Sequence, residues 1–111
     1  MTVKIEGFLQ ECVEAFVKTL SPKKIYLFGS RARGDHNEHS DYDFFIIMDD
    51  SVKLNGDEAA RARLALLGTS YERPVDILVN KESSFLKNSH NKDFVNYYVQ
   101  KEGIIIYEKE Q

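Results

Sequence analysis

The sequence predicts one α/β (α+β) domain over residues 1–111, layered around a small sheet. Segments with helical periodicity alternate with short apolar segments of strand length. A length of 111 residues suits one compact domain. The composition, 42% apolar and 30% charged, is typical of a globular chain and not of a disordered one. No internal repeat or linker composition divides the chain.

The first predicted element is an amphipathic helix. Its apolar residues recur at helical spacing between Ile5 and Leu20. The helix should end before Ser21-Pro22, because a residue that precedes proline resists the helical conformation. Cys12 falls among these apolar positions, so we expect a buried thiol. As the only cysteine, it excludes an internal disulfide framework.

Four short apolar segments predict strands. Residues 24–28 (KIYLF) run directly into a glycine, and residues 43–49 (DFFIIMD) are apolar enough for a strand covered on both faces. A third strand is predicted at 74–79 (PVDILV), where the leading proline loses no ladder hydrogen bond. Residues 103–108 (GIIIYE) predict a last strand or an extended tail.

Two further helices are expected. Residues 58–67 (EAARARLALL) are strong helix formers, with Gly68 as a left-handed cap. On that helix, Arg61 and Arg63 are expected on the exposed side, unless they face the site and meet phosphate. Residues 91–103 predict a helix that ends at a glycine. Its packed side should hold Phe94, Val95, Tyr98 and Val99.

The charge and hydropathy of the chain limit its function. Lys plus Arg total 15 and Asp plus Glu total 18, so the net charge is −3. A groove that grips nucleic acid through its phosphates needs a basic surplus, so no extended nucleic-acid groove is expected. No apolar run reaches the length of a membrane span, and the N-terminus does not have the pattern of a secretion signal. We predict a cytoplasmic protein.

A Gly-Ser pair follows the first strand. Gly29 and Ser30 would lie at the carboxyl end of that strand, where α/β proteins tend to bind ligands. Ser30 is expected to cap a short helix over 31–34, and Arg31 and Arg33 would add positive charge for a phosphate. For the pair taken alone, an ordinary capped turn is the favoured interpretation, because such short motifs match often by chance.

Three aspartates point to a cation. Asp41 and Asp43 enter the second strand two residues apart, so both should face one side of the sheet. Two carboxylates that close repel each other unless a cation such as Mg²⁺ lies between them. Asp76 is a charge in an apolar strand, which costs free energy unless something compensates. It could lie at an exposed strand end or face Arg31 or Arg33, but a shared cation site explains all three carboxylates.

These residues resemble a known signature. Gly29-Ser30, ten intervening residues and Asp41-Tyr42-Asp43 are similar to the GS…DxD motif of polymerase-β-like nucleotidyltransferases. The string GSRARGDHNEHSDYDF resembles the minimal members of that superfamily, the MNT proteins. Further matches to the pattern of those members are Ala32, Arg33, Gly34 and Ser40. Asp76 lies where the family keeps its third carboxylate.

The resemblance implies a small mixed sheet flanked by helices, with two Mg²⁺ ions and ATP as the substrate. Asp41 and Asp43 would hold both ions, and Asp76 would hold the catalytic ion and help to deprotonate the attacking hydroxyl. Gly29 and Ser30 would bind the β- and γ-phosphates. Nucleoside monophosphate would pass to a hydroxyl group and pyrophosphate would leave.

The resemblance also implies a partner. MNT proteins are often encoded beside a helical HEPN-family protein as toxin–antitoxin pairs, and in characterised pairs the MNT protein transfers AMP to the HEPN ribonuclease. Two alternatives stay open at this point. The chain could be an antitoxin that neutralises its partner by binding alone, or a transferase that modifies a small molecule, although it is too short to carry an acceptor domain.

Overall fold

A computed structural model describes residues 7–69 and 74–110. In chain order its elements are α1 (Phe8–Leu20), β1 (Lys24–Phe28), α2 (Ser30–Arg33), β2 (Tyr42–Met48), α3 (Glu58–Ala65), the 3-10 turn η1 (Leu66–Gly68), β3 (Val75–Lys81), α4 (Glu82–Asn88), α5 (Val95–Glu102) and β4 (Ile104–Glu108). The four predicted strands are confirmed.

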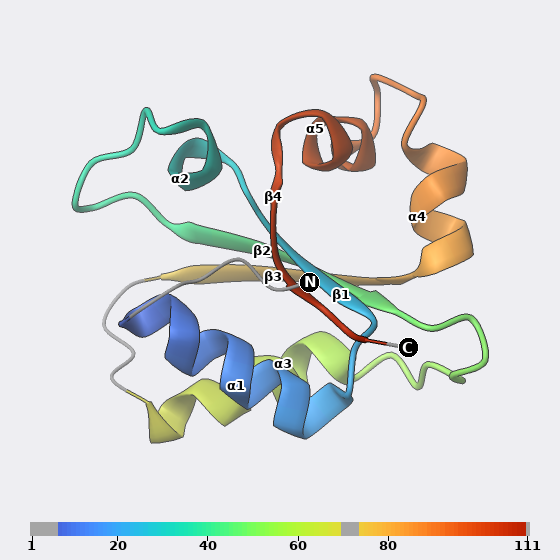
Figure 1. The fold of residues 1–111 in the computed structure, drawn as a ribbon, viewed down its shortest axis with the longest axis horizontal. Helices are drawn as coiled ribbons and strands as arrows, with labels where there is room; N and C mark the ends of the chain where they lie inside the picture. The colour runs from blue at the N-terminus through green and yellow to red at the C-terminus, as the bar shows by residue number, and fades with distance from the viewer. Residues whose placement is uncertain (1–6, 70–73, 111) are drawn as a thin grey trace.

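The strands form one mixed sheet in the order β3-β2-β1-β4. β1 pairs antiparallel with β2 and with β4, whereas β2 and β3 run parallel. Parallel neighbours need a crossover, and here α3 and η1 provide it. Figure 1 shows α1 and α3 on one face of the sheet, with α2, α4 and α5 on the other.

Strand β2 is covered on both faces, as predicted. Phe44, Ile46 and Met48 pack into the core between the sheet and the helices α1 and α3. Phe45 and Ile47 point the other way and pack into a smaller core under α4 and α5. The two cores follow from the alternation of side chains along one apolar strand.

Helix α1 confirms the predicted amphipathic helix and its end. Ser21 takes a left-handed conformation with φ of 50°, and its amide closes the helix on the carbonyl of Val17 at 2.9 Å. Cys12 is fully buried, and burial raises the pKa of its thiol to about 12. The start predicted at Ile5 lies outside the described residues.

The predicted end of the third helix was wrong. α3 ends at Ala65 and continues as η1, and Gly68 does not have the positive φ of a left-handed cap. Arg63 donates a hydrogen bond from Nη1 to the carbonyl of Val75 at 2.5 Å, and Arg61 contacts Asp57. Arg61 thus contacts the beginning of α3 and Arg63 the beginning of β3. Helix α3 lies on the face of the sheet opposite α2.

The C-terminal helices differ from the prediction in two ways. α4 was not predicted; it is anchored by Phe85, which stacks on Tyr26 with centroids 5.5 Å apart and meets Phe45 at 5.0 Å. α5 begins only at Val95 and buries Asn96 and Val99. Its expected packed side was therefore wrong at three positions. The residues that are exposed instead are Phe94, Val95 and Tyr98.

None of the helices in the described ranges combines the length and the apolar character that crossing a membrane requires.

Candidate active site

The site begins at the turn between β1 and α2. Gly29 has φ of 77°, a conformation that favours glycine, and it caps α2. A side chain here would also collide with Asp43, because a Cβ built on Gly29 would come too close to Oδ2 of that carboxylate for any real contact. Glycine is thus required twice, by its own backbone angle and by the carboxylate that lies against it.

The prediction that Ser30 caps this helix was wrong. Gly29 is the cap and Ser30 is the first helical residue, with its carbonyl accepting from the Gly34 amide at 2.9 Å. Gly34 has φ of 89° and ends the helix in a left-handed conformation. The turn keeps Ser30 at the carboxyl end of β1, next to the paired residues Phe28 and Asp43.

Asp43 and Asp76 lie side by side on adjacent parallel strands. The register pairs them directly, so both side chains leave the same face of the sheet. The pKa of Asp43 rises to about 6, first because it is partly buried, then because of a hydrogen bond to Asp76 and the negative charges of Asp76 and Asp41. The positive charge of Arg33 works in the opposite direction. The two carboxyl groups therefore share one small space.

The exposure of Asp76 explains how an apolar strand tolerates it. Burial alternates along β3, with Val75 and Ile77 buried and Asp76 and Leu78 exposed. Asp76 thus needs no arginine to compensate its charge. It lies near the beginning of the strand, where it faces Asp43.

Asp41 lies outside β2, so strand alternation does not set the direction of its side chain. β2 begins at Tyr42, so Asp41 belongs to the preceding loop and is exposed. It is close enough for its charge to act on Asp43. Within the described part of the chain, no three His, Cys, Asp or Glu side chains already form a metal cluster. What the structure contains is a carboxylate pair with a third carboxylate at its edge.

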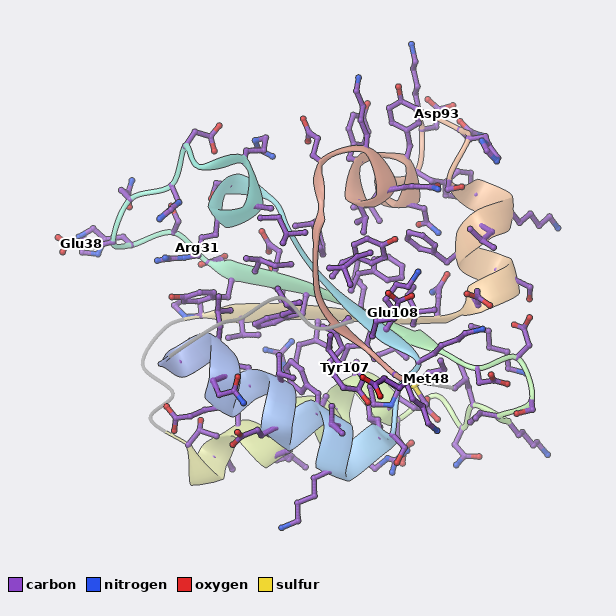
Figure 2. All side chains as sticks on the ribbon, in the orientation of Figure 1. Arg31, Glu38, Met48, Asp93, Tyr107 and Glu108 are labelled. Atoms are coloured by element: carbon purple, nitrogen blue, oxygen red, sulfur yellow. The ribbon has the colours of Figure 1, made fainter. Side chains whose placement is uncertain are left out.

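The two arginines of the turn have different surroundings. Arg31 donates to the carbonyls of Ser40 and Asn37 at 3.1 and 3.2 Å. Arg33 is exposed and contacts Asp35 at 3.2 Å and Glu102 of α5 at 3.8 Å. Figure 2 shows Arg31 at the beginning of β2, whereas Glu38 points into solvent from the tip of the loop. Glu102, far away in the sequence, was not predicted as a neighbour of this turn, and no sequence pattern indicates it.

The donor set fits a divalent cation. Mg²⁺ prefers carboxylate oxygens, one or two from the protein with others from substrate phosphates. The pKa of Asp43 is raised mainly by burial, and its hydrogen bond to Asp76 and the negative charges of Asp76 and Asp41 add to the shift. A bound cation would relieve the repulsion between these carboxylates. The residues that could hold such an ion are Asp43 and Asp76, with Asp41 beside them.

Comparison with known proteins agrees with this geometry. The family model described as polymerase beta, nucleotidyltransferase matches residues 10–111. The chain belongs to this family. Members of the family generally use a nucleoside triphosphate and a divalent metal, and membership gives the chain a general role in nucleotidyl transfer. No curated protein matches the sequence of this nucleotidyltransferase.

Two solved structures share the fold of this nucleotidyltransferase. One is a chain of a crystal structure described as a toxin-antitoxin with AMP-PNP, at a TM-score of 0.67 and 17% identity, covering 95% of this chain and 77% of that one. The other, from Sulfolobus solfataricus, has been suggested to be a nucleotidyltransferase. It has a TM-score of 0.62 and 21% identity, covering 93% of this chain and 79% of that one.

Proposed function

We propose that this nucleotidyltransferase moves AMP from ATP onto a hydroxyl group of a partner protein, as the antitoxin of a toxin–antitoxin pair. The observation that carries the proposal is the Asp43–Asp76 pair, which lies against the Gly29 turn. The likeness to a chain crystallised as a toxin-antitoxin with AMP-PNP supports the partner and the nucleotide. The partner that we propose is a HEPN-family protein encoded nearby.

In the proposed reaction, the hydroxyl oxygen attacks the α-phosphorus of ATP. A new oxygen–phosphorus bond forms, the bond between the α-phosphorus and the bridging oxygen breaks, and pyrophosphate leaves. Asp76 accepts the hydroxyl proton. Two Mg²⁺ ions held by Asp41, Asp43 and Asp76 would supply positive charge to the phosphates.

The remaining site residues would orient the triphosphate. Gly29 and Ser30 bind the β- and γ-phosphates in this proposal, because the turn brings their backbone close to the carboxylate pair. Arg33 adds a guanidinium whose present partners are exposed carboxylates that a phosphate can displace. Orientation and charge neutralisation would account for most of the acceleration.

The test is transfer of label from α-³²P-ATP to the neighbour-encoded partner in the presence of Mg²⁺. We expect label on the partner with the wild-type protein and none with Asp41→Asn, Asp43→Asn or Asp76→Asn. Asp93→Asn is the matched control, since Asp93 is an exposed carboxylate far from the pair, and it should transfer as the wild type does.

The same samples distinguish the binding-only alternative. A partner that stays unlabelled, and is neutralised equally well by the wild type and by Asp43→Asn, would show an antitoxin that acts by binding alone. Label on a small hydroxylated compound but not on the partner would point to a small-molecule acceptor instead.

A further inference from the structure

We propose that Arg31 is a positioning residue, which holds the loop over residues 34–41 so that Asp41 lies beside the Asp43–Asp76 pair. This inference rests on the proposed function, because it assigns Asp41 a share in holding the metal. It replaces the interpretation of Arg31 as a phosphate ligand, which the sequence alone suggested.

Arg31 binds the loop at two points. Its Nε donates to the carbonyl of Ser40 at 3.1 Å and its Nη2 to the carbonyl of Asn37 at 3.2 Å. These two residues also close on each other, since the Ser40 amide donates to the Asn37 carbonyl at 3.1 Å and the Asn37 amide donates to Ser40 Oγ at 3.0 Å. The loop thus contains a small closed turn, and Arg31 fixes that turn next to Asp41.

The guanidinium is itself fixed to the core. It lies over the ring of Tyr42, 4.1 Å from the centroid. Tyr42 in turn meets Phe8 of α1 at 4.9 Å and is nearly parallel to Phe44, with an interplanar angle of 7°. A planar cation stacked on an aromatic ring loses little freedom when it forms hydrogen bonds. Arg31 therefore links the loop to the packed aromatic side chains of α1 and β2.

These contacts leave Arg31 poorly suited to bind phosphate. Two of its donor groups serve backbone carbonyls, which would lose their partner if the side chain turned to a ligand. Arg33 differs, because both of its partners are carboxylates of exposed side chains. We therefore propose that Arg33 binds phosphate and that Arg31 holds the loop in place.

The experiment measures metal binding without turnover. Mn²⁺ is titrated into the protein with α,β-methylene-ATP, which cannot be cleaved at the reacting bond, and free Mn²⁺ is followed by electron paramagnetic resonance. Arg31→Lys keeps the positive charge but cannot serve both carbonyls at once. We expect it to weaken Mn²⁺ binding by roughly tenfold or more, as loss of an orienting partner does at other metal sites.

Three further measurements make the role specific. Nucleotide binding in EDTA should stay within about twofold of the wild type, since the residue acts on metal placement and not on phosphate. Asp41→Asn should weaken Mn²⁺ binding similarly, and the double variant no further, because both changes remove the same ligand. Amide exchange at Ser40 should be faster in Arg31→Lys. Arg61→Lys, on α3, is the matched control and should behave as the wild type does.

Unchanged Mn²⁺ binding in Arg31→Lys, or fully additive effects with Asp41→Asn, would overturn the positioning role. A loss of nucleotide binding in EDTA would show instead that Arg31 contacts phosphate. If the wild type binds Mn²⁺ with this dependence on Arg31 but transfers no nucleotide, the proposed function fails and the inference stands. If transfer occurs and Arg31→Lys matches the wild type, the inference fails and the function stands.

Discussion

The carboxylate of Asp43 lies in the space that a side chain at Gly29 would need, so the motif glycine and the motif aspartate fit together as one unit. The unit joins the carboxyl end of β1 to the beginning of β2, which the antiparallel register brings side by side. This fit explains why a glycine is needed here beyond its backbone angle. It also makes the glycine a sensitive position for testing the site.

Gly29→Ala should disable the site. The β-carbon would push Asp43 away from Asp76, and displacement of a reacting group by about 1 Å can cost roughly 100-fold in rate. The backbone of Gly29, with φ of 77° and ψ of −157°, lies in a region that essentially only glycine adopts, so alanine there should also cost about 1–3 kcal/mol of stability. AMP transfer and urea unfolding measure the two effects separately.

Gly34→Ala is the matched control for that variant. Gly34 has φ of 89°, but a β-carbon there would meet nothing within 4 Å. Because Gly34 is in the left-handed helical conformation, we expect alanine there to cost about 1–2 kcal/mol of stability with transfer largely retained. Equal loss of transfer in both variants would show that backbone strain, and not the collision with Asp43, decides activity.

The raised pKa of Asp43 predicts how stability depends on pH in metal-free buffer. With a folded pKa of about 6 and an ordinary value of 3.8, the folded state binds more protons between these values. The stabilising contribution of the protonated group is complete below pH 3.8 and is lost as pH rises to about 6 and above. Asp43→Asn should therefore be more stable than the wild type at pH 7, by on the order of 1 kcal/mol after allowance for solvent screening.

The difference between the two proteins should vanish near pH 4, where the aspartate of the wild type is protonated in the folded state. Urea unfolding in EDTA across pH 4 to 8 gives the comparison. A stability advantage of Asp43→Asn that grows as pH falls would contradict the assigned direction of the shift.

Cys12 should be unreactive in the folded protein. Its side chain is fully buried, and burial raises the pKa of the thiol to about 12, so almost no thiolate forms at neutral pH. At pH 8 a disulfide reagent should label Cys12 only as fast as the protein unfolds. In about 6 M guanidinium the labelling rate should be that of an exposed, unperturbed thiol. Rapid labelling under native conditions would argue against the packing of α1.

Phe85 should be the anchor of α4. It is buried against Tyr26 and Phe45, and its replacement by alanine should cost about 3–5 kcal/mol. Leu86 is its neighbour on the exposed side of the same helix, and Leu86→Ala should change stability by about 0.5 kcal/mol or less. Urea unfolding compares the two, and similar losses would mean that α4 packs through a different side.

Local sequence patterns were sufficient to predict many of the helices, strands and site residues of this protein. The apolar periodicity of α1 and the continuous apolar run of β2 predict both elements, because each reflects the surface that the element buries. The Gly-Ser turn and the aspartates are likewise visible, because glycine geometry and carboxylate charge belong to single residues. The prediction failed at α4 and at the packed side of α5, where short helices are selected by neighbours and not by their own pattern.

The sequence by itself determined the composition of the site, namely a glycine turn, two arginines and three aspartates. Only the tertiary structure decided their relations: Asp76 meets Asp43 through parallel pairing of β2 with β3, and Arg31 lies over the ring of Tyr42 while it donates to the loop carbonyls. Register and ring packing depend on contacts between segments far apart in the chain. Spacing within one segment cannot fix them, because the free energy that selects them comes from the whole sheet and its two cores.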